Sequence, residues 1–334
     1  MKGVNFNSEE RHPIMTMKHL FNISVFHLPD ELKAAREFVK DPANRTDGLE
    51  ILTGYDPIPK PMAECMIGVH LPYATDWYGP FTGKRQVPES KQQEFARWNS
   101  YGKDRKEIVE NIRIMMKCAG DLNPAYGVFH AASGNYDEIT GVEFTDDPDS
   151  VVRAMCEMLN EACSVFPGGK PPLRLVFENT WCPGLMMQDN RGLDILENKL
   201  EFDNWGICLD TGHLLVSMGS VHSEAEALEM LNACVDRYSS DMKDRITNMH
   251  LHVNTTADYM RSFRKPDTTG MSAEERILFA HHHIGTMDAH QPFTDPGVKD
   301  LVDRLTPDYL IHEMGSITSE GQMRQHRIQR SLFP

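Results

Sequence analysis

Histidine and acidic residues recur at the ends of short apolar segments in this sequence of 334 residues. Six segments in succession end in such a residue, at His70, His130, Glu178, Asp210, His250-Leu251-His252 and Glu313. Burying an unpaired charge costs several kcal/mol unless the group is paired or binds a metal ion. If the six segments end at one edge of the fold, their side chains predict a site for divalent metal ions. Imidazole nitrogens mixed with carboxylate oxygens suit Zn²⁺ or Mn²⁺ better than Ca²⁺.

The residue types also indicate how such a site is arranged. The ligands predicted for one ion are Glu178, Asp210, His252 and Glu313, with the two glutamates on opposite sides. His250 lies on the same face of its strand as His252, so either histidine could be the ligand and the other could contact substrate. His213 follows Asp210 by three residues in the segment DTGH, where it could bind a neighbouring ion or a substrate.

Short runs rich in Val, Ile and Leu predict the strands that carry these residues. They cover 21–27, 48–53, 66–70, 125–130, 173–178, 206–210, 246–252 and 308–313. Most lack alternation of polar and apolar residues, as expected of parallel strands buried on both faces. Helical periodicity over 103–119 and 149–166, and the capping spacing of Ser272 and Glu275, place helices between strands. Eight strands alternating with helices predict a (β/α)8 TIM barrel, whose strand ends share one rim.

The chain is long enough for two domains at roughly 150 residues each. No linker rich in Pro, Gly or Ser divides it, so we predict one domain over 1–334, with a barrel core at about 20–315 and a C-terminal tail at 316–334. The extra length lies after strands, at 71–101, 181–197 and 254–294, and therefore over the active face. The first of these segments contains Trp77, Tyr78, Phe81, Phe95 and Trp98. It is either a lid or substrate wall, or a loop with a small core of its own.

Composition excludes several classes of protein. The 34 Lys and Arg against 49 Asp and Glu give a formal charge of −15, which disfavours binding to phosphate backbones. No apolar run approaches the ~20 residues that span a bilayer. Glu9, Glu10 and Arg11 stand where a signal peptide would be apolar, and the seven scattered cysteines form no metal or disulfide pattern. These features predict a cytoplasmic protein with reduced thiols, and they leave oligomerisation open.

The segments GVHLPY, VFHAAS, FENT, LDTGH, MHLHVN and IHEM, in this order, resemble the xylose isomerase-like TIM barrels, most closely the endonuclease IV branch. The resemblance covers about 66–314 and implies three zinc ions with nine ligands. The implied ligands are His70, His130 and Glu178 for the first ion; Glu178 as a bridge with Asp210, His252 and Glu313 for the second; and His213, Asp288 and His290 for the third. The nearby run His281-His282-His283 could supply a ligand in place of the last pair.

The sequence also departs from that branch. Tyr73 matches a position from which DNA-repair members enter the duplex, but the segment TGYDPIPKP lacks the arginine expected there. The sugar isomerase and epimerase branch shares only the four-ligand core, and Asp258 stands where its arginine would be. Arg261, close by, could bind a phosphate or carboxylate. The predicted substrate contacts are Tyr73, Trp77, His250 and Arg261.

Two functions follow from these residues, both for a metal-dependent enzyme with one to three Zn²⁺ or Mn²⁺ ions and a small-molecule substrate. The preferred one is hydrolysis of a small phosphoester or carbohydrate-derived molecule by a metal-bound hydroxide, with intact nucleic acid disfavoured. The alternative is a sugar or sugar phosphate isomerase or epimerase, in which Glu178 and Glu313 move a proton through an enediolate. The predicted catalytic residues are Glu178, Glu313 and His213.

Overall fold

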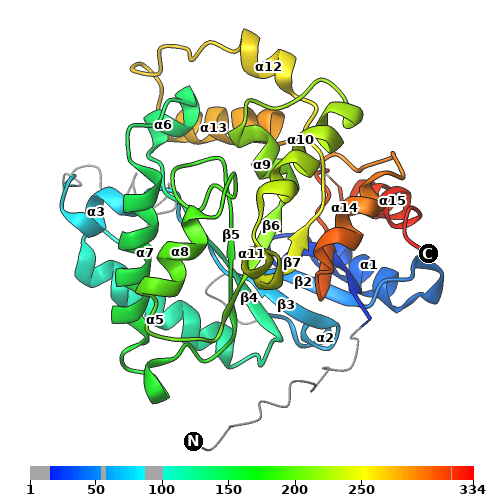
Figure 1. Ribbon diagram of the computed structural model, residues 1–334, viewed down its shortest axis with the longest axis horizontal. Helices are drawn as coiled ribbons and strands as arrows, with labels where there is room; N and C mark the ends of the chain where they lie inside the picture. Colours follow the sequence, from blue (N-terminus) through cyan, green and yellow to red (C-terminus); the bar gives the residue numbers. More distant parts are fainter. Residues whose placement is uncertain (1–15, 54–57, 87–100, 317) are drawn as a thin grey trace, which may run out of the picture.

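Eight parallel strands form a closed barrel surrounded by helices (Figure 1). The computed structural model describes residues 16–53, 58–86, 101–316 and 318–334. The strands are β1 (Lys18–Ser24), β2 (Gly48–Leu52), β3 (Met66–His70), β4 (Tyr126–His130), β5 (Leu175–Glu178), β6 (Trp205–Asp210), β7 (Ile246–His250) and β8 (Tyr309–His312). Each strand pairs with the next, and β8 pairs with β1 to close the ring. The predicted (β/α)8 barrel is confirmed.

The helices lie outside the ring and in the segments that follow the strands. They are α1 (Pro29–Lys40), α2 (Lys60–Ala63), α3 (Tyr78–Thr82), α5 (Arg105–Gly120), α6 (Tyr136–Gly141), α7 (Pro148–Cys163), α8 (Arg191–Lys199), α9 (Thr211–Ser217), α10 (Glu224–Arg237), α11 (Ser240–Arg245), α12 (Ala257–Ser262), α13 (Ala273–Met287), α14 (Val298–Leu305) and α15 (Ser319–Arg330). The predicted capping box of Ser272 and Glu275 begins α13. In the described part of the chain, no helix is both long and apolar enough to cross a membrane.

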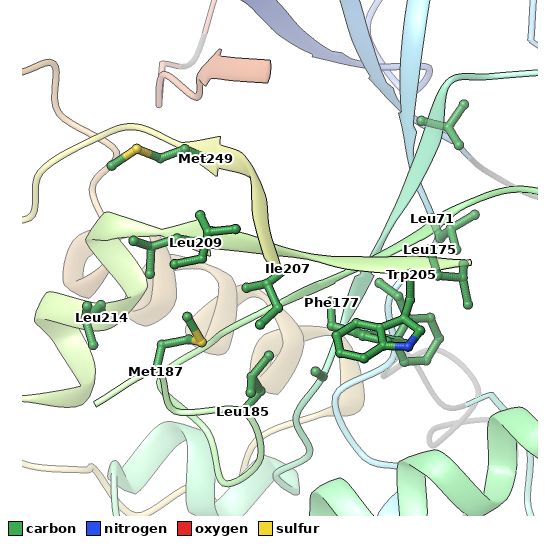
Figure 2. Close-up of a cluster of buried hydrophobic side chains, with 14 of the residues drawn as sticks. Leu71, Leu175, Phe177, Leu185, Met187, Trp205, Ile207, Leu209, Leu214 and Met249 are labelled. Atoms are coloured by element: carbon green, nitrogen blue, oxygen red, sulfur yellow. The ribbon is translucent and has the colours of Figure 1, made fainter. Parts of the chain in front are cut away.

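Successive side chains of each strand point alternately to the helices and into the barrel. Outward-facing Phe177, Ile207 and Leu209 share a buried cluster with residues of the surrounding segments (Figure 2). A second cluster fills the barrel and consists of Leu20, Tyr126, Val128, Val176, Cys208 and Ile311. The residues two positions further along β4, β5, β6 and β8 are His130, Glu178, Asp210 and Glu313. The alternation therefore directs these four side chains into the barrel mouth.

Three strand boundaries differ from prediction in ways that matter here. β1 begins at Lys18 rather than 21, because the Lys18 N–H donates to Asp308 O at 2.9 Å. It ends before Phe26, which is apolar in sequence but lies 77% exposed in the turn before α1. β7 ends at His250 rather than 252: the Leu251 N–H still donates to Ile311 O at 2.8 Å, and the chain then pairs at Val253 with Gln291. The segment 181–197, expected as extra loop, contains the start of α8.

The C-terminal segment, expected as a tail, contains α15 packed against the barrel through buried histidines. His19 Nδ1 lies 3.0 Å from His312 Nε2, and His326 Nε2 lies 2.8 Å from Thr46 Oγ1. Gln329 donates to Leu251 O at 2.8 Å and joins the same network. Burial, with the charge of Arg330, lowers the pKa of His19 and of His326 to about 3, and burial also holds the pKa of His312 well below its usual range. These rings are therefore neutral in the folded protein.

Candidate metal centre

Three groups of potential metal ligands meet at the barrel mouth. Within each group the ligand atoms lie within 4.8 Å of one another. The groups are His70, His130 and Glu178; Glu178, Asp210, His250 and Glu313; and His213, His252, Asp288 and His290. All nine ligands implied by the resemblance lie in these groups, together with His250.

Glu178, the last residue of β5, connects the first two groups. Its Oε2 lies 3.1 Å from His70 Nε2 and 3.0 Å from His130 Nε2. Its Oε1 lies 3.0 Å from His250 Nδ1, and the residue is only 1% exposed. Burial raises the pKa of this carboxyl, but His130 and His250 outweigh burial and hold the pKa well below its usual range. Both carboxylate oxygens therefore face imidazoles, as a carboxylate shared by two ions would.

The structure sorts His250 and His252 into different groups. His250 ends β7 and points into the barrel, with Nδ1 2.8 Å from Glu313 Oε2. His252 lies two residues beyond the strand end, and its ring stacks on His290 at 3.9 Å. Of the two histidines that the sequence left open for the second group, His250 lies with Glu178 and Glu313, and His252 lies with the third group, although His252 Nε2 also lies 3.0 Å from Asp210 Oδ2. A β-carbon on Gly212 would overlap the His252 ring, which explains why glycine stands in the DTGH segment.

The third group draws its ligands from three separate segments. Asp288 Oδ2 lies 3.0 Å from His213 Nε2 and 3.0 Å from His290 Nε2. Asn254 holds this arrangement, since its Nδ2 donates to Asp288 Oδ1 at 2.6 Å and its Oδ1 accepts from the His290 N–H at 3.1 Å. Of the nearby histidine run, His283 is buried, with its ring 3.9 Å from that of Phe263. Among the described residues, the third group therefore contains the pair Asp288 and His290 and none of that run, although His281 lines the cavity above the site.

Backbone carbonyls orient two of the imidazoles. His70 Nδ1 lies 2.9 Å from Leu71 O, and His213 Nδ1 lies 2.9 Å from Asn179 O. A ring that donates its Nδ1–H to a carbonyl presents the lone pair of Nε2 to an ion. His70 Nε2 lies 3.1 Å from Glu178 Oε2, and His213 Nε2 lies 3.0 Å from Asp288 Oδ2. The orientation of both rings therefore fits metal ligation.

The pKa of His290 and a buried nitrogen atom of His252 also fit a metal site. Burial opposes a proton on His290, but Asp288 and Glu313 outweigh it and raise its pKa to about 9. His252 Nδ1 is a buried atom without a hydrogen-bond partner among the described residues. Nitrogen and carboxylate ligands without a thiolate suit Zn²⁺ or Mn²⁺. The residues present therefore fit divalent metal ions.

A cavity of about 510 Å³ opens over the three groups. His70, His130, His213, Asp288, His290 and Glu313 lie on its wall. Tyr73 stacks on His130 at 4.6 Å and Trp181 meets the His213 ring edge-on at 4.9 Å. Ile284 of α13 also lines the cavity, so the insertion after β7 contributes to its wall. Of the described residues that line the cavity, none is Lys or Arg.

The predicted substrate contacts are only partly placed at this cavity. Tyr73 lines it and is 39% exposed. Trp77 does not: it is fully buried, and its indole N–H donates to Ala132 O at 2.8 Å. Arg261 does not either, since its side chain is 67% exposed and paired with Asp258 on α12. Trp77, Tyr78 and Phe81 are all buried, as a loop with its own core requires, while Phe95 and Trp98 fall outside the described residues.

Sequence reasoning missed three polar residues that support the site. Glu50 lies within β2 and is 2% exposed, and Asn254 holds the third group. Asn179 bonds with the backbone of Asp210 in both directions, at 2.8 and 2.9 Å. For Glu50, its position in the middle of the apolar run GLEIL was a usable signal. The two asparagines stand close to predicted ligands in the sequence, and nothing local distinguishes them.

No protein-family model matches this chain, and no curated protein sequence matches it. Solved structures do. The 3-keto-D-glucoside 4-epimerase YcjR from E. coli aligns over 95% of this chain and 100% of its own, at 12% identity and TM-score 0.50. Endonuclease IV from Thermus thermophilus aligns over 94% and 98%, at 15% identity and TM-score 0.49. The match to the epimerase shows the fold and agrees with the predicted (β/α)8 barrel.

Proposed function

We propose that the protein is a divalent-metal-dependent hydrolase with two or three ions in the barrel mouth and a small-molecule substrate. The observation that supports this best is the position of Glu178, whose two oxygens face different groups of ligands. Bound ions would supply Lewis acidity and lower the pKa of a water molecule towards neutrality. Extra histidines beyond a four-ligand core are needed only if more than one ion binds.

The residues of the chain would divide the remaining work. His70, His130, Glu178, Asp210, His250 and Glu313 would hold two ions, and His213, His252, Asp288 and His290 would hold a third. Glu313 lines the cavity, with a side chain that is 17% exposed. It is the carboxylate of the first two groups placed to accept a proton from a group in the cavity. Tyr73 offers an aromatic face to the non-reacting part of the substrate.

Cavity size and charge narrow the substrate. A volume of about 510 Å³ lies in the range of small-ligand sites. With no Lys or Arg among the described lining residues, a phosphate group would have to be held by the ions themselves. These features support a small phosphoester bound through its phosphate, or a carbohydrate-derived molecule, over intact nucleic acid.

A sugar isomerase or epimerase is the second candidate. Glu178 Oε1 and Glu313 Oε2 lie 3.0 and 2.8 Å from the same atom, His250 Nδ1, as two ligands of one ion would. In that reaction the two glutamates would move a proton to and from a carbon atom. The burial of Glu178 and its contacts with His70 and His130 disfavour this, because such a carboxylate cannot reach substrate.

Metal analysis and two variants test the proposal. We expect two or three equivalents of metal per chain, and loss of phosphoester or glycoside turnover in Glu178→Gln. His70→Ala should lose about one equivalent and most activity, whereas His222→Ala, an exposed histidine, should match wild type. One equivalent of metal, full activity of His70→Ala and turnover only of ketose or aldose substrates would establish the isomerase instead. A chain that binds no divalent metal would refute both candidates.

A further inference from the structure

We propose that Glu50, anchored by Tyr126, is a positioning residue that prepares the His250 ring to bind an ion through Nδ1. The inference rests on the metal centre proposed above and extends it into the barrel interior. The three residues lie on strands that are not neighbours, β2, β4 and β7.

Glu50 occupies a place where apolar side chains are the rule. The interiors of TIM barrels are filled mainly by branched apolar residues, and here Leu20, Val176 and Ile311 belong to that layer. A carboxylate among such groups is costly unless each oxygen has a partner. Glu50 has two: its Oε2 accepts a hydrogen bond from the Tyr126 hydroxyl at 2.8 Å, and its Oε1 lies 2.9 Å from His250 Nε2.

The contact with His250 is made on the side of the ring away from the ligand groups. His250 Nδ1 faces Glu313 Oε2 at 2.8 Å and Glu178 Oε1 at 3.0 Å, while Nε2 faces Glu50. A neutral imidazole carries its proton on one nitrogen only, and a carboxylate beside Nε2 favours the proton there. The lone pair is then left on Nδ1. The Nε2–H is not aligned with the carboxylate as in a linear hydrogen bond, so the effect is mainly electrostatic.

Tyr126 determines which way the Glu50 carboxylate points. Its ring is 1% exposed and its hydroxyl has a fixed position inside the barrel. With Oε2 held by this hydroxyl, rotation of the carboxylate away from His250 would break a buried hydrogen bond and leave its donor unpaired, which is unfavourable. A carboxylate behind a metal-binding histidine typically changes metal affinity about 10–100-fold when it is removed.

Metal affinity, rather than turnover, is the test. Protein stripped with a chelator is titrated with Zn²⁺ against a chromophoric chelator, and Co²⁺ absorption reports the ligand field. We expect Glu50→Gln to weaken one ion of the set about 10–100-fold and to change the Co²⁺ spectrum, while the other ions bind as in wild type. Tyr126→Phe should weaken the same ion by a smaller factor. Tyr309→Phe is the matched control, because the Tyr309 ring packs beside that of Tyr126 at 4.8 Å and its hydroxyl is not the one bonded to Glu50.

The outcomes separate the inference from the proposed function. If wild-type protein binds no divalent ion, the metal centre itself is refuted. If wild type binds ions and Glu50→Gln binds them all with unchanged affinity, the metal centre stands and the positioning role is wrong. Unchanged affinity with lost turnover would mean that Glu50, which also lines the cavity, contacts substrate instead. If Glu50→Gln does not fold, equal affinities of Tyr126→Phe and Tyr309→Phe would still overturn the inference.

Discussion

The buried histidines where α15 packs against the barrel should make the protein lose stability steeply as the pH falls below neutrality. His19, His312 and His326 are neutral in the folded chain, and burial is the main cause of their lowered pKa values. In the unfolded chain each ring takes up a proton near pH 6.5. The stability that these rings contribute is therefore complete above pH 6.5, and it is lost as the pH falls from 6.5 towards 3.

The magnitude follows from the width of that window. A pH of 5 lies about 1.5 units below the ordinary histidine pKa. At about 1.36 kcal/mol per unit, protonation of each ring in the unfolded chain lowers the free energy of unfolding by about 2 kcal/mol. Three rings together cost about 6 kcal/mol, a large part of the 5–15 kcal/mol by which folded proteins are typically stable. His290 does not contribute to this slope. Its pKa is raised to about 9, so its stabilising effect is complete below pH 6.5 and is lost only as the pH rises through 9.

Urea unfolding of chelator-treated protein between pH 7.5 and 5 measures the effect, with His326→Phe as the comparison. This ring sits against Phe21 and Phe38, so an apolar aromatic ring should fit, and Thr46 Oγ1 keeps its bond to Asn44 O. Relative to wild type, the variant should lose about 2 kcal/mol less on going to pH 5. Parallel stability curves for the two proteins would refute the reasoning, because they would mean that His326 is not held neutral.

Three further predictions concern the barrel mouth. Gly212→Ala should displace the His252 ring and remove about one equivalent of metal. Gly270→Ala is the control, because a β-carbon there has open space, and it should keep its metal. Equal metal contents of the two variants would show that His252 is not a ligand. Binding of Zn²⁺ at pH 7.5 should release protons, because the pKa of His290 is about 9 and the ring must lose its proton to bind an ion. Calorimetric enthalpies that do not depend on the buffer would contradict this. Arg261→Ala should leave KM unchanged, and a raised KM would show that this exposed side chain reaches the substrate after all.

Much of the site could be predicted because parallel strands end at a common rim. A His, Asp or Glu that ends an apolar strand must lie at that rim whatever the rest of the fold does, which is why Glu178 and Asp210 were correctly placed in one cluster. The same reasoning could not choose between His250 and His252, since the choice needed the exact end of β7. A shift of two residues keeps the face of the strand but moves the side chain out of the barrel.

The predicted substrate contacts show a different limit. Trp77 and Arg261 were chosen because aromatic and basic residues suit a substrate wall, but residue type does not determine which way a loop side chain points. Trp77 points inward, where its indole N–H donates to Ala132 O, and Arg261 pairs with Asp258. Tyr73, only three residues past the end of β3, had less freedom and lies in the cavity.

The barrel could be predicted from the sequence, because alternating strand and helix patterns and short connections leave few other ways to bury the apolar strands. The gathering of carboxylates and imidazoles at one rim could be predicted as well. How these side chains are grouped depends on the packing of the whole chain: Glu178 faces two groups, His250 and His252 belong to different groups, and Asp288, 75 residues from His213, lies 3.0 Å from it. These facts depend on distances between side chains on different strands and loops, and local residue patterns carry no information about such distances. The same holds for Glu50, because its contact with His250 joins two strands that are far apart in the sequence.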